Sequence, residues 1–178
     1  QRAAVAKVQH ALALSLLRLA RVNRSLQRVV LASSETDRSL VIAREIGAPG
    51  LEAEALYSRA ELARLQGHYR EALEHYDAVE RAESRIRDPD LLWQVHFGRA
   101  RAQEAIGNVS AALASLEAAV QLIEGVRARL QEPRFRSGYV EDKFEVYLEL
   151  MRLQLQQGRT ADAFSTAERL HARSFVEQ

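Results

Sequence analysis

Two stretches of this chain align with each other, and this internal repeat is the strongest constraint on the fold. The aligned segments are residues 55–79, ALYSRAELARLQGHYREALEHYDAV, and residues 95–119, VHFGRARAQEAIGNVSAALASLEAA. Gly67 and Gly107 have the same separation as Pro49 and Pro89 (107 − 67 = 89 − 49 = 40). Two separate sets of helix-breaking residues with one period indicate a chain built from repeated structural units.

Each unit reads as two helices joined by a short turn. Ala, Leu, Arg and Glu dominate the sequence, prolines are few, and no segment alternates as a strand would. Glycine at the turn supplies the positive φ that a short connection between helices needs. A small residue recurs five positions after the turn, where two helices must approach closely. These residues are Ala32, Ala72, Ala112 and Ala163, and the position seven before the turn holds Ala20, Ala60, Ala100 and Met151.

The pattern extends in both directions. Gly158 is the turn of a later copy in residues 147–170, and Gln27 stands one period before Gly67, without glycine. The sequence therefore predicts an all-α fold, a right-handed superhelix of about four antiparallel helix pairs in which neighbouring pairs share their apolar faces. We expect a single domain over residues 1–178. Its approximate pairs are residues 10–46, 51–86, 91–131 and 140–178.

This repeat resembles the tetratricopeptide repeat (TPR). The segment Gln66–Tyr76, QGHYREALEHY, carries the small and aromatic residues of that signature, although the period here is longer. Arg59 and Arg99 depart from it, because they stand where a leucine is usual. Either their stems are buried and their guanidinium groups reach solvent, or the alignment is shifted slightly.

The C-terminal third, residues 119–178, is similar to the segment that precedes the peptidase domain in the CHAT family of caspase-like proteins. The matching elements are VRARL, a basic-aromatic stretch, Phe144–Glu149 and the helix ADAFSTAERLHARSF. An extended helix after Gly107 and an insertion around Pro133 would explain why the last turn spacing is longer (158 − 107 = 51). The resemblance implies a regulatory array whose peptidase domain, with its His/Cys dyad, lies outside this chain, and both ends read as cut.

Several functional classes are excluded or disfavoured. There are no cysteines, and no catalytic or phosphate-binding motif is present, so we expect neither an enzyme nor a bound cofactor. The formal net charge is +1, which disfavours nucleic acid despite local arginine clusters. No apolar run approaches the roughly 20 residues that a membrane-spanning helix needs and no signal peptide is visible, so we expect a cytoplasmic protein without membrane contact.

One set of residues has the spacing of metal ligands. His68, Glu71 and His75 share one helical face, but a structural zinc site normally has four clear ligands. We therefore interpret this set as a solvated face.

The first helix of each pair supplies the candidate binding surface. In TPR arrays this helix lines the concave side, where extended peptides often bind. Counted back from the turn, three columns recur at ten, six and three positions. They are Leu17, Tyr57, Phe97 and Leu148; Arg21, Glu61, Arg101 and Arg152; and Arg24, Arg64, Glu104 and Leu155. Tyr57, Phe97 and Leu148 with the charged residues predict a contact surface for a protein or peptide. The alternative is that the aromatic rings pack between repeats and the charges are solvated.

Two functions are compatible with these patterns. The first is a non-catalytic interaction and regulatory scaffold that binds a protein or peptide ligand, or the adjacent domain of a CHAT-type protein. The second is the effector-sensing and oligomerisation arm of a bacterial transcription regulator. The lysine and asparagine residues of the chaperone-tail clamp found in some TPR proteins are missing from the columns, which disfavours that ligand class.

Overall fold

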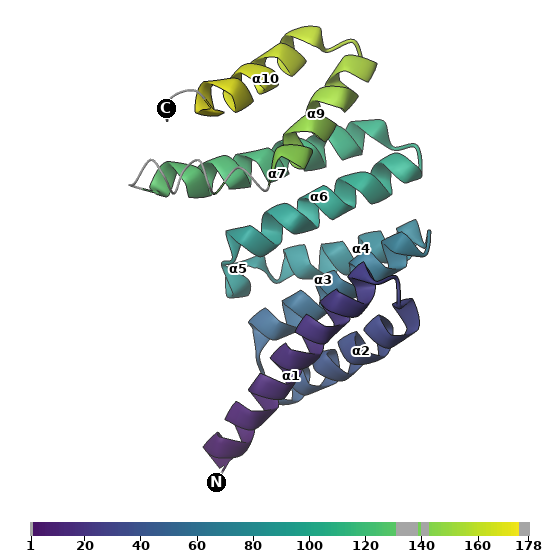
Figure 1. The fold of residues 1–178 in the computed structure, drawn as a ribbon, viewed down its shortest axis with the longest axis vertical. Helices are drawn as coiled ribbons and strands as arrows, with labels where there is room; N and C mark the ends of the chain where they lie inside the picture. Colours follow the sequence, from purple (N-terminus) through teal and green to yellow (C-terminus); the bar gives the residue numbers. More distant parts are fainter. Residues whose placement is uncertain (1, 131–138, 140–142, 175–178) are drawn as a thin grey trace. The chain divides into compact units, whose positions relative to one another are not determined.

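The computed structural model describes residues 2–130, 139 and 143–174 and shows an all-helical chain (Figure 1). Successive long helices pack as antiparallel neighbours, which confirms the all-α fold of paired helices. The helices are α1 (Arg2–Ser25), α2 (Val29–Glu45), α3 (Pro49–Leu65), α4 (Tyr69–Arg81), α5 (Glu83–Ile86), α6 (Pro89–Ala105), α7 (Val109–Arg129), α9 (Phe144–Gln156) and α10 (Thr160–Ser174).

The helices form two compact units, Gln1–Asp88 and Pro89–Gln178. In the first unit α1 packs on α2 and α3 on α4, and in the second α6 packs on α7 and α9 on α10. Helix α1 begins at Arg2, well before the predicted start of the first pair at residue 10. The predicted insertion around Pro133 lies outside the described residues. The superhelical winding of all four pairs stays a prediction.

Every hairpin has the same turn. Three residues connect the helices of each pair, and the middle one always has positive φ. At Gly67 φ is +80°, the Gly67 N–H donates to the Arg64 carbonyl at 3.1 Å, and the His68 N–H donates to the Ala63 carbonyl at 2.9 Å. This is the Schellman arrangement, which satisfies the last carbonyls of a helix. The predicted turns at Gly67, Gly107 and Gly158 are therefore confirmed.

The structural unit is half as long as the sequence repeat. Residues with positive φ stand at equal intervals, at Gln27, Gly47, Gly67, Arg87 and Gly107. Gln27 (φ +58°) and Arg87 (φ +49°) adopt the left-handed conformation without being glycine. One period of the sequence repeat thus contains two turns, one within a pair and one between successive pairs.

Alanine forms the crossing point in three of the pairs. Each pair brings one alanine from either helix into the core, and none of these six side chains is more than 1% exposed. A side chain of this size lets two helix backbones approach more closely than Leu or Val would. The residues are Ala20 and Ala32, Ala60 and Ala72, and Ala100 and Ala112. In the last pair Ala163 is buried, but its counterpart Met151 is only half-buried.

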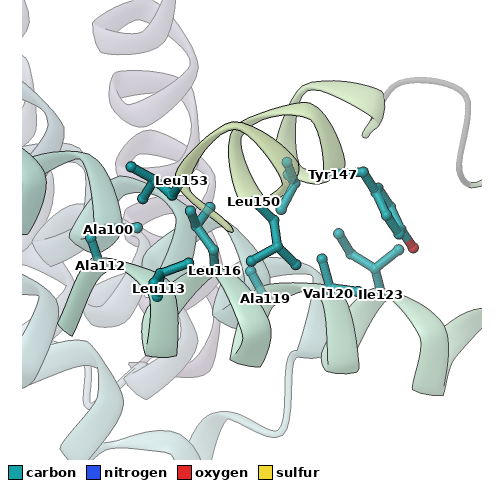
Figure 2. Packing of buried hydrophobic residues seen from close by; sticks show 11 residues of the cluster. Ala100, Ala112, Leu113, Leu116, Ala119, Val120, Ile123, Tyr147, Leu150 and Leu153 are labelled. Carbon is teal, nitrogen blue, oxygen red and sulfur yellow. The ribbon is translucent and has the colours of Figure 1, made fainter. Parts of the chain in front are cut away.

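The core of the second unit is built by α6, α7 and α9. Figure 2 shows Tyr147, Leu150 and Leu153 of α9 directed toward Leu116 and Ile123 of α7. The Tyr147 ring is fully buried, and its hydroxyl donates to Glu124 Oε1 at 2.5 Å. Burial raises the pKa of the Tyr147 hydroxyl to about 12. Apolar packing with one satisfied polar group therefore joins α9 to α7.

A polar pair links the two helices of three hairpins, four positions before the turn and eight after it. Asn23 Nδ2 donates to Glu35 at 2.9 Å. The Ser115 hydroxyl donates to Gln103 Oε1 at 2.7 Å, and the Thr166 hydroxyl donates to Gln154 Oε1 at 3.1 Å. Ala63 and His75 occupy these positions in the second hairpin.

Two of the described helices are long and apolar enough to cross a membrane by length and composition, Ala3–Ser25 and Val109–Arg129. On this measure the expectation that no apolar segment approaches that length is wrong. The reason is that apolar residues are distributed around each helix rather than in one uninterrupted run. In α7 many of them face the core, including Leu116, Val120 and Ile123, as they would in a core helix.

Replacing Gly67 by alanine tests the turn. A Cβ at Gly67 would meet no atom within 4 Å, so only the positive φ opposes the change, and we expect a loss of about 1 kcal/mol in the free energy of unfolding. Gly50 also has open space around it but lies in α3 without positive φ. Gly50→Ala is the control and should instead stabilise by about 0.4–1 kcal/mol. Urea denaturation followed by circular dichroism measures both, and equal effects of the two substitutions would contradict the turn assignment.

Candidate functional site

The predicted site residues divide between the two units. Arg21 of α1 and Tyr57, Glu61 and Arg64 of α3 belong to the first unit. The second unit contains the rest, which lie on α6 and α9. These are Phe97, Arg101 and Glu104, and Leu148 and Arg152. In both units the first helix of each pair supplies the residues, as the columns predicted.

In the first unit three of the predicted residues, Tyr57, Glu61 and Arg64, belong to a polar cluster on α3 that is centred on the buried Glu61. The Arg64 guanidinium donates to both carboxylate oxygens of Glu61, with Nε–Oε1 at 3.2 Å and Nη2–Oε2 at 2.9 Å. The hydroxyl of Tyr76, which α4 contributes, donates to the same carboxylate. The Tyr57 and Tyr76 ring centroids are 6.3 Å apart. The Arg24 guanidinium lies 5.9 Å from the centre of the Tyr57 ring.

Electrostatics keep this cluster charged. Burial alone would raise the pKa of Glu61, but the hydrogen bonds and charge of Arg64 and the Tyr76 hydroxyl outweigh it, so the pKa of Glu61 is lowered. Burial and the Glu61 charge raise the pKa of Tyr76. Glu61 is 9% exposed and accepts three hydrogen bonds. Because its oxygens are already occupied, Glu61 holds α3 to α4 rather than offering a free carboxylate to a ligand.

Arg21, on α1, is the exposed member of this set, whereas Tyr57 and Arg64 are half-buried. Burial and the Glu61 charge raise the pKa of Tyr57. A ligand on this surface would therefore meet a neutral phenol edge beside the arginines of α1.

In the second unit the charged residues pair with each other across α6 and α9. Arg101 Nη2 lies 2.8 Å from Glu149 Oε1 and 2.5 Å from Glu145 Oε1. Arg152 Nη2 lies 2.7 Å from Glu104 Oε2. The Arg101 guanidinium also stands 4.1 Å from the centre of the Phe97 ring. These contacts link α9 to α6 and cover part of the Phe97 ring.

Two leucine side chains of α9 are exposed to solvent. Leu148 is 55% exposed and Leu155 is 56% exposed. The first-helix surface of the second unit thus combines accessible apolar side chains with arginine–glutamate pairs. Glu145 and Glu149 were not identified from the sequence, because no spacing relates α9 to α6. Tyr76 was noted only as part of the repeat signature.

A pocket of about 240 Å³ opens between α2, α3 and α4 of the first unit. Its polar lining comprises Ser33, Asp37, Arg59, Gln66, Glu71 and His75. Ala63, which replaces the bridging amide of the other hairpins, is part of the wall. Arg59 donates to Asp37 Oδ1 at 2.8 Å, so its guanidinium reaches a partner on α2 while remaining partly exposed.

The residues with metal-ligand spacing lie beside this pocket. His68 Nδ1 is 3.6 Å from one oxygen of Glu71, and His75 Nε2 is 3.7 Å from the other. Within residues 2–130, 139 and 143–174, no group of His, Asp and Glu side chains is arranged to hold a metal ion.

Comparison with protein-family models finds no match, and comparison with curated proteins finds none either. The chain is an all-helical protein of sequentially paired helices, and its candidate site rests on the geometry of those helices.

Replacing Glu61 by glutamine tests the buried cluster. The lowered pKa of Glu61 means that its ionised form stabilises the fold above the unfolded-state pKa of about 4.3, and that this contribution is lost as pH falls through the folded-state pKa. We expect Glu61→Gln to destabilise by about 1–3 kcal/mol at neutral pH and to flatten the loss of stability on acidification.

Urea denaturation at several pH values measures this effect. Glu74 is exposed on α4, and Glu74→Gln is the matched control. An acid dependence that is the same in Glu61→Gln as in the unmodified chain would show that Glu61 is not the group responsible.

Proposed function

We propose that this chain is a non-catalytic interaction scaffold, a TPR-like array that binds a protein or peptide segment on the first helices of its pairs. The observation that carries the proposal is the surface of α6 and α9. There Leu148 and Leu155 are more than half exposed, and ion pairs of Arg101 and Arg152 link α9 to α6. Protein-binding patches commonly combine accessible apolar side chains with polar or charged residues at the rim.

The resemblance of residues 119–178 to the segment before the CHAT peptidase domain supplies the proposed context. In that context the partner is a protein ligand or the adjacent peptidase domain, the location is cytoplasmic, and the array is regulatory. The ion pairs support this role, because a surface whose charges are already oriented loses little conformational entropy when it binds.

The pocket between α2, α3 and α4 favours a second candidate, an effector-sensing arm of a transcription regulator. Its volume of about 240 Å³ is below the usual range for drug-sized ligands, but its lining offers both signs of charge through Arg59, Asp37, Glu71 and His75. The full reading frame distinguishes the two candidates, since a peptidase domain beside this array favours the scaffold and a DNA-binding domain favours the sensor.

The scaffold is tested by partner capture with surface variants. We expect Leu148→Ser/Leu155→Ser to reduce recovery of the partner by about tenfold or more, because truncating apolar anchors typically costs over about 1 kcal/mol each. Both side chains are exposed, so the fold should be retained, which circular dichroism checks. Tyr57→Ala and Phe97→Ala extend the test to the aromatic column.

The matched control is Val41→Ser, which changes an exposed apolar residue of α2. Recovery that is equal for Leu148→Ser/Leu155→Ser, Phe97→Ala and the unmodified chain would rule out a ligand on the first helices.

A further inference from the structure

Two arginines stand at the same position in the two units but differ in their partners. Arg21 of α1 and Arg101 of α6 both lie six residues before the turn of their own pair (27 − 21 = 107 − 101 = 6). Arg101 is held by Glu145 and Glu149, which α9, the first helix of the next pair, contributes at 2.5 and 2.8 Å. Within the residues that the structure describes, Arg21 has no such ion pair. The first unit thus lacks a contact that the second unit makes.

The residues of α3 explain the difference. The position of Glu149, nine residues before the turn, is occupied in α3 by Ser58 (158 − 149 = 67 − 58 = 9). Ser58 is buried, and its hydroxyl is hydrogen-bonded to a side chain of α2 at 2.9 Å. The position of Glu145 is occupied by Glu54 (158 − 145 = 67 − 54 = 13). Burial raises the pKa of Glu54, and the charge of Arg21 opposes this only in part, since the two side chains are near each other without forming an ion pair.

Arg24 is a second arginine on the same side of α1. Its guanidinium lies 5.9 Å from the centre of the Tyr57 ring of α3, and the charges of Arg21 and Arg24 both act on the Tyr57 hydroxyl. The charge of Arg24 also acts on Glu61, but that carboxylate already accepts three hydrogen bonds. In the described chain no carboxylate accepts a hydrogen bond from either arginine, although both lie on the side of α3. We call Arg21 and Arg24 the α1 arginine pair.

Positive charge exceeds negative charge around the α1 arginine pair. The other charged groups near it are Arg18, Arg64, Glu54, Glu61, Asp88 and, when protonated, His10. Arg64 and Glu61 cancel each other as an ion pair at 2.9 Å. Three arginines of α1 then remain beside two carboxylates, those of Glu54 and Asp88. An anionic group is therefore attracted to this side of α1.

A protein carboxylate fits this position better than a nucleic-acid backbone. Arg101 already binds carboxylates at the equivalent position, through the charge-assisted hydrogen bonds that guanidinium groups favour. A nucleic-acid strand carries a phosphate at every nucleotide, and Glu54 and Asp88 would repel the phosphates that follow the first one. The half-buried Tyr57 ring next to the arginines offers an apolar surface. An acidic side chain with an apolar neighbour matches both features.

We propose that the α1 arginine pair binds an acidic side chain of a partner protein segment, as Arg101 binds Glu149 in the second unit. The carboxylate accepts hydrogen bonds from Arg21 and Arg24, and an apolar residue beside it contacts the Tyr57 ring. This inference rests on the proposed function, in which the first helices bind a protein or peptide segment. It adds that the segment bound by the first unit is acidic.

The test selects ligands without assuming their sequence. A displayed library of random linear peptides is panned on the whole chain, and the enriched peptides are synthesised with a fluorescent label. We expect Asp and Glu to be enriched about twofold or more over their frequency in the library. Fluorescence anisotropy measures the binding of each acidic peptide, which should weaken as salt is added.

Two variants assign the binding to the α1 arginine pair. Arg21→Gln/Arg24→Gln should weaken binding of the acidic peptides by about fivefold or more, because the charge-assisted donors are lost. Glu54→Gln should tighten binding by about twofold, because it removes a carboxylate that repels the ligand and acts on Arg21. Opposite effects of these two changes place the bound carboxylate beside Arg21. Circular dichroism checks that each variant keeps its helices.

The matched control is Arg38→Gln/Arg81→Gln. It removes the same charge from exposed arginines of α2 and α4, the second helices of the same unit. Because these arginines lie outside the first-helix surface, the control should change binding of the acidic peptides by less than about twofold.

Three results would overturn the inference. The first is enrichment of peptides that are no more acidic than the library. The second is binding of acidic peptides that Arg21→Gln/Arg24→Gln weakens no more than the control does. The third is binding of single-stranded DNA or RNA that depends on the α1 arginine pair while no peptide binds.

The same experiment separates this inference from the proposed function. Enriched peptides that depend on Leu148 and Leu155 but not on the α1 arginine pair would refute the inference and leave the scaffold function intact. Peptides that depend on the pair but not on these leucines would refute the site on α6 and α9 instead. A library that yields no binding peptide would refute both.

Discussion

Close approach of the two helices in each pair is the constraint on which the rest of the structure depends. Buried alanines such as Ala60 and Ala72 permit that approach. The two helices of each pair are joined by only three residues. A connection of that length needs one residue with positive φ. The connection also sets which positions of the two helices face each other, so polar pairs such as Gln103 and Ser115 recur at a constant distance from it.

Much of the fold could be predicted because it rests on local signals that repeat. Turn glycines and alanine crossings identified the pairs without any knowledge of long-range contacts. The shorter unit of one helix and one turn was missed since Gln27 and Arg87 adopt positive φ without glycine, and only the glycines signal that conformation in a sequence. The start of α1 was placed too late because its first turns are exposed and so show no buried periodicity.

The candidate site was predictable in position but not in chemistry. The columns placed Glu61, Arg101 and Arg152 on the first helices, yet they could not show that these charges are already paired. Arg101 donates to Glu145 and Glu149 of α9, which follow it by 44 and 48 residues. Neither separation is a period of the repeat, so no signal in the sequence indicates these pairs. For Glu61 the decisive partner is Tyr76, whose hydroxyl reaches it from the second helix of the same hairpin. The alternative that charges of the columns are simply solvated is wrong for Glu61, which is buried.

The alternating direction of successive long helices also limits how such a chain can grow in evolution. Adding one helix with its turn would reverse the direction of every later helix, so the first helix of a pair would take the place of a second. Its alanines and polar residues would then face the wrong neighbours. Duplication of a whole pair preserves both direction and facing. The length of the array should therefore change in even numbers of long helices.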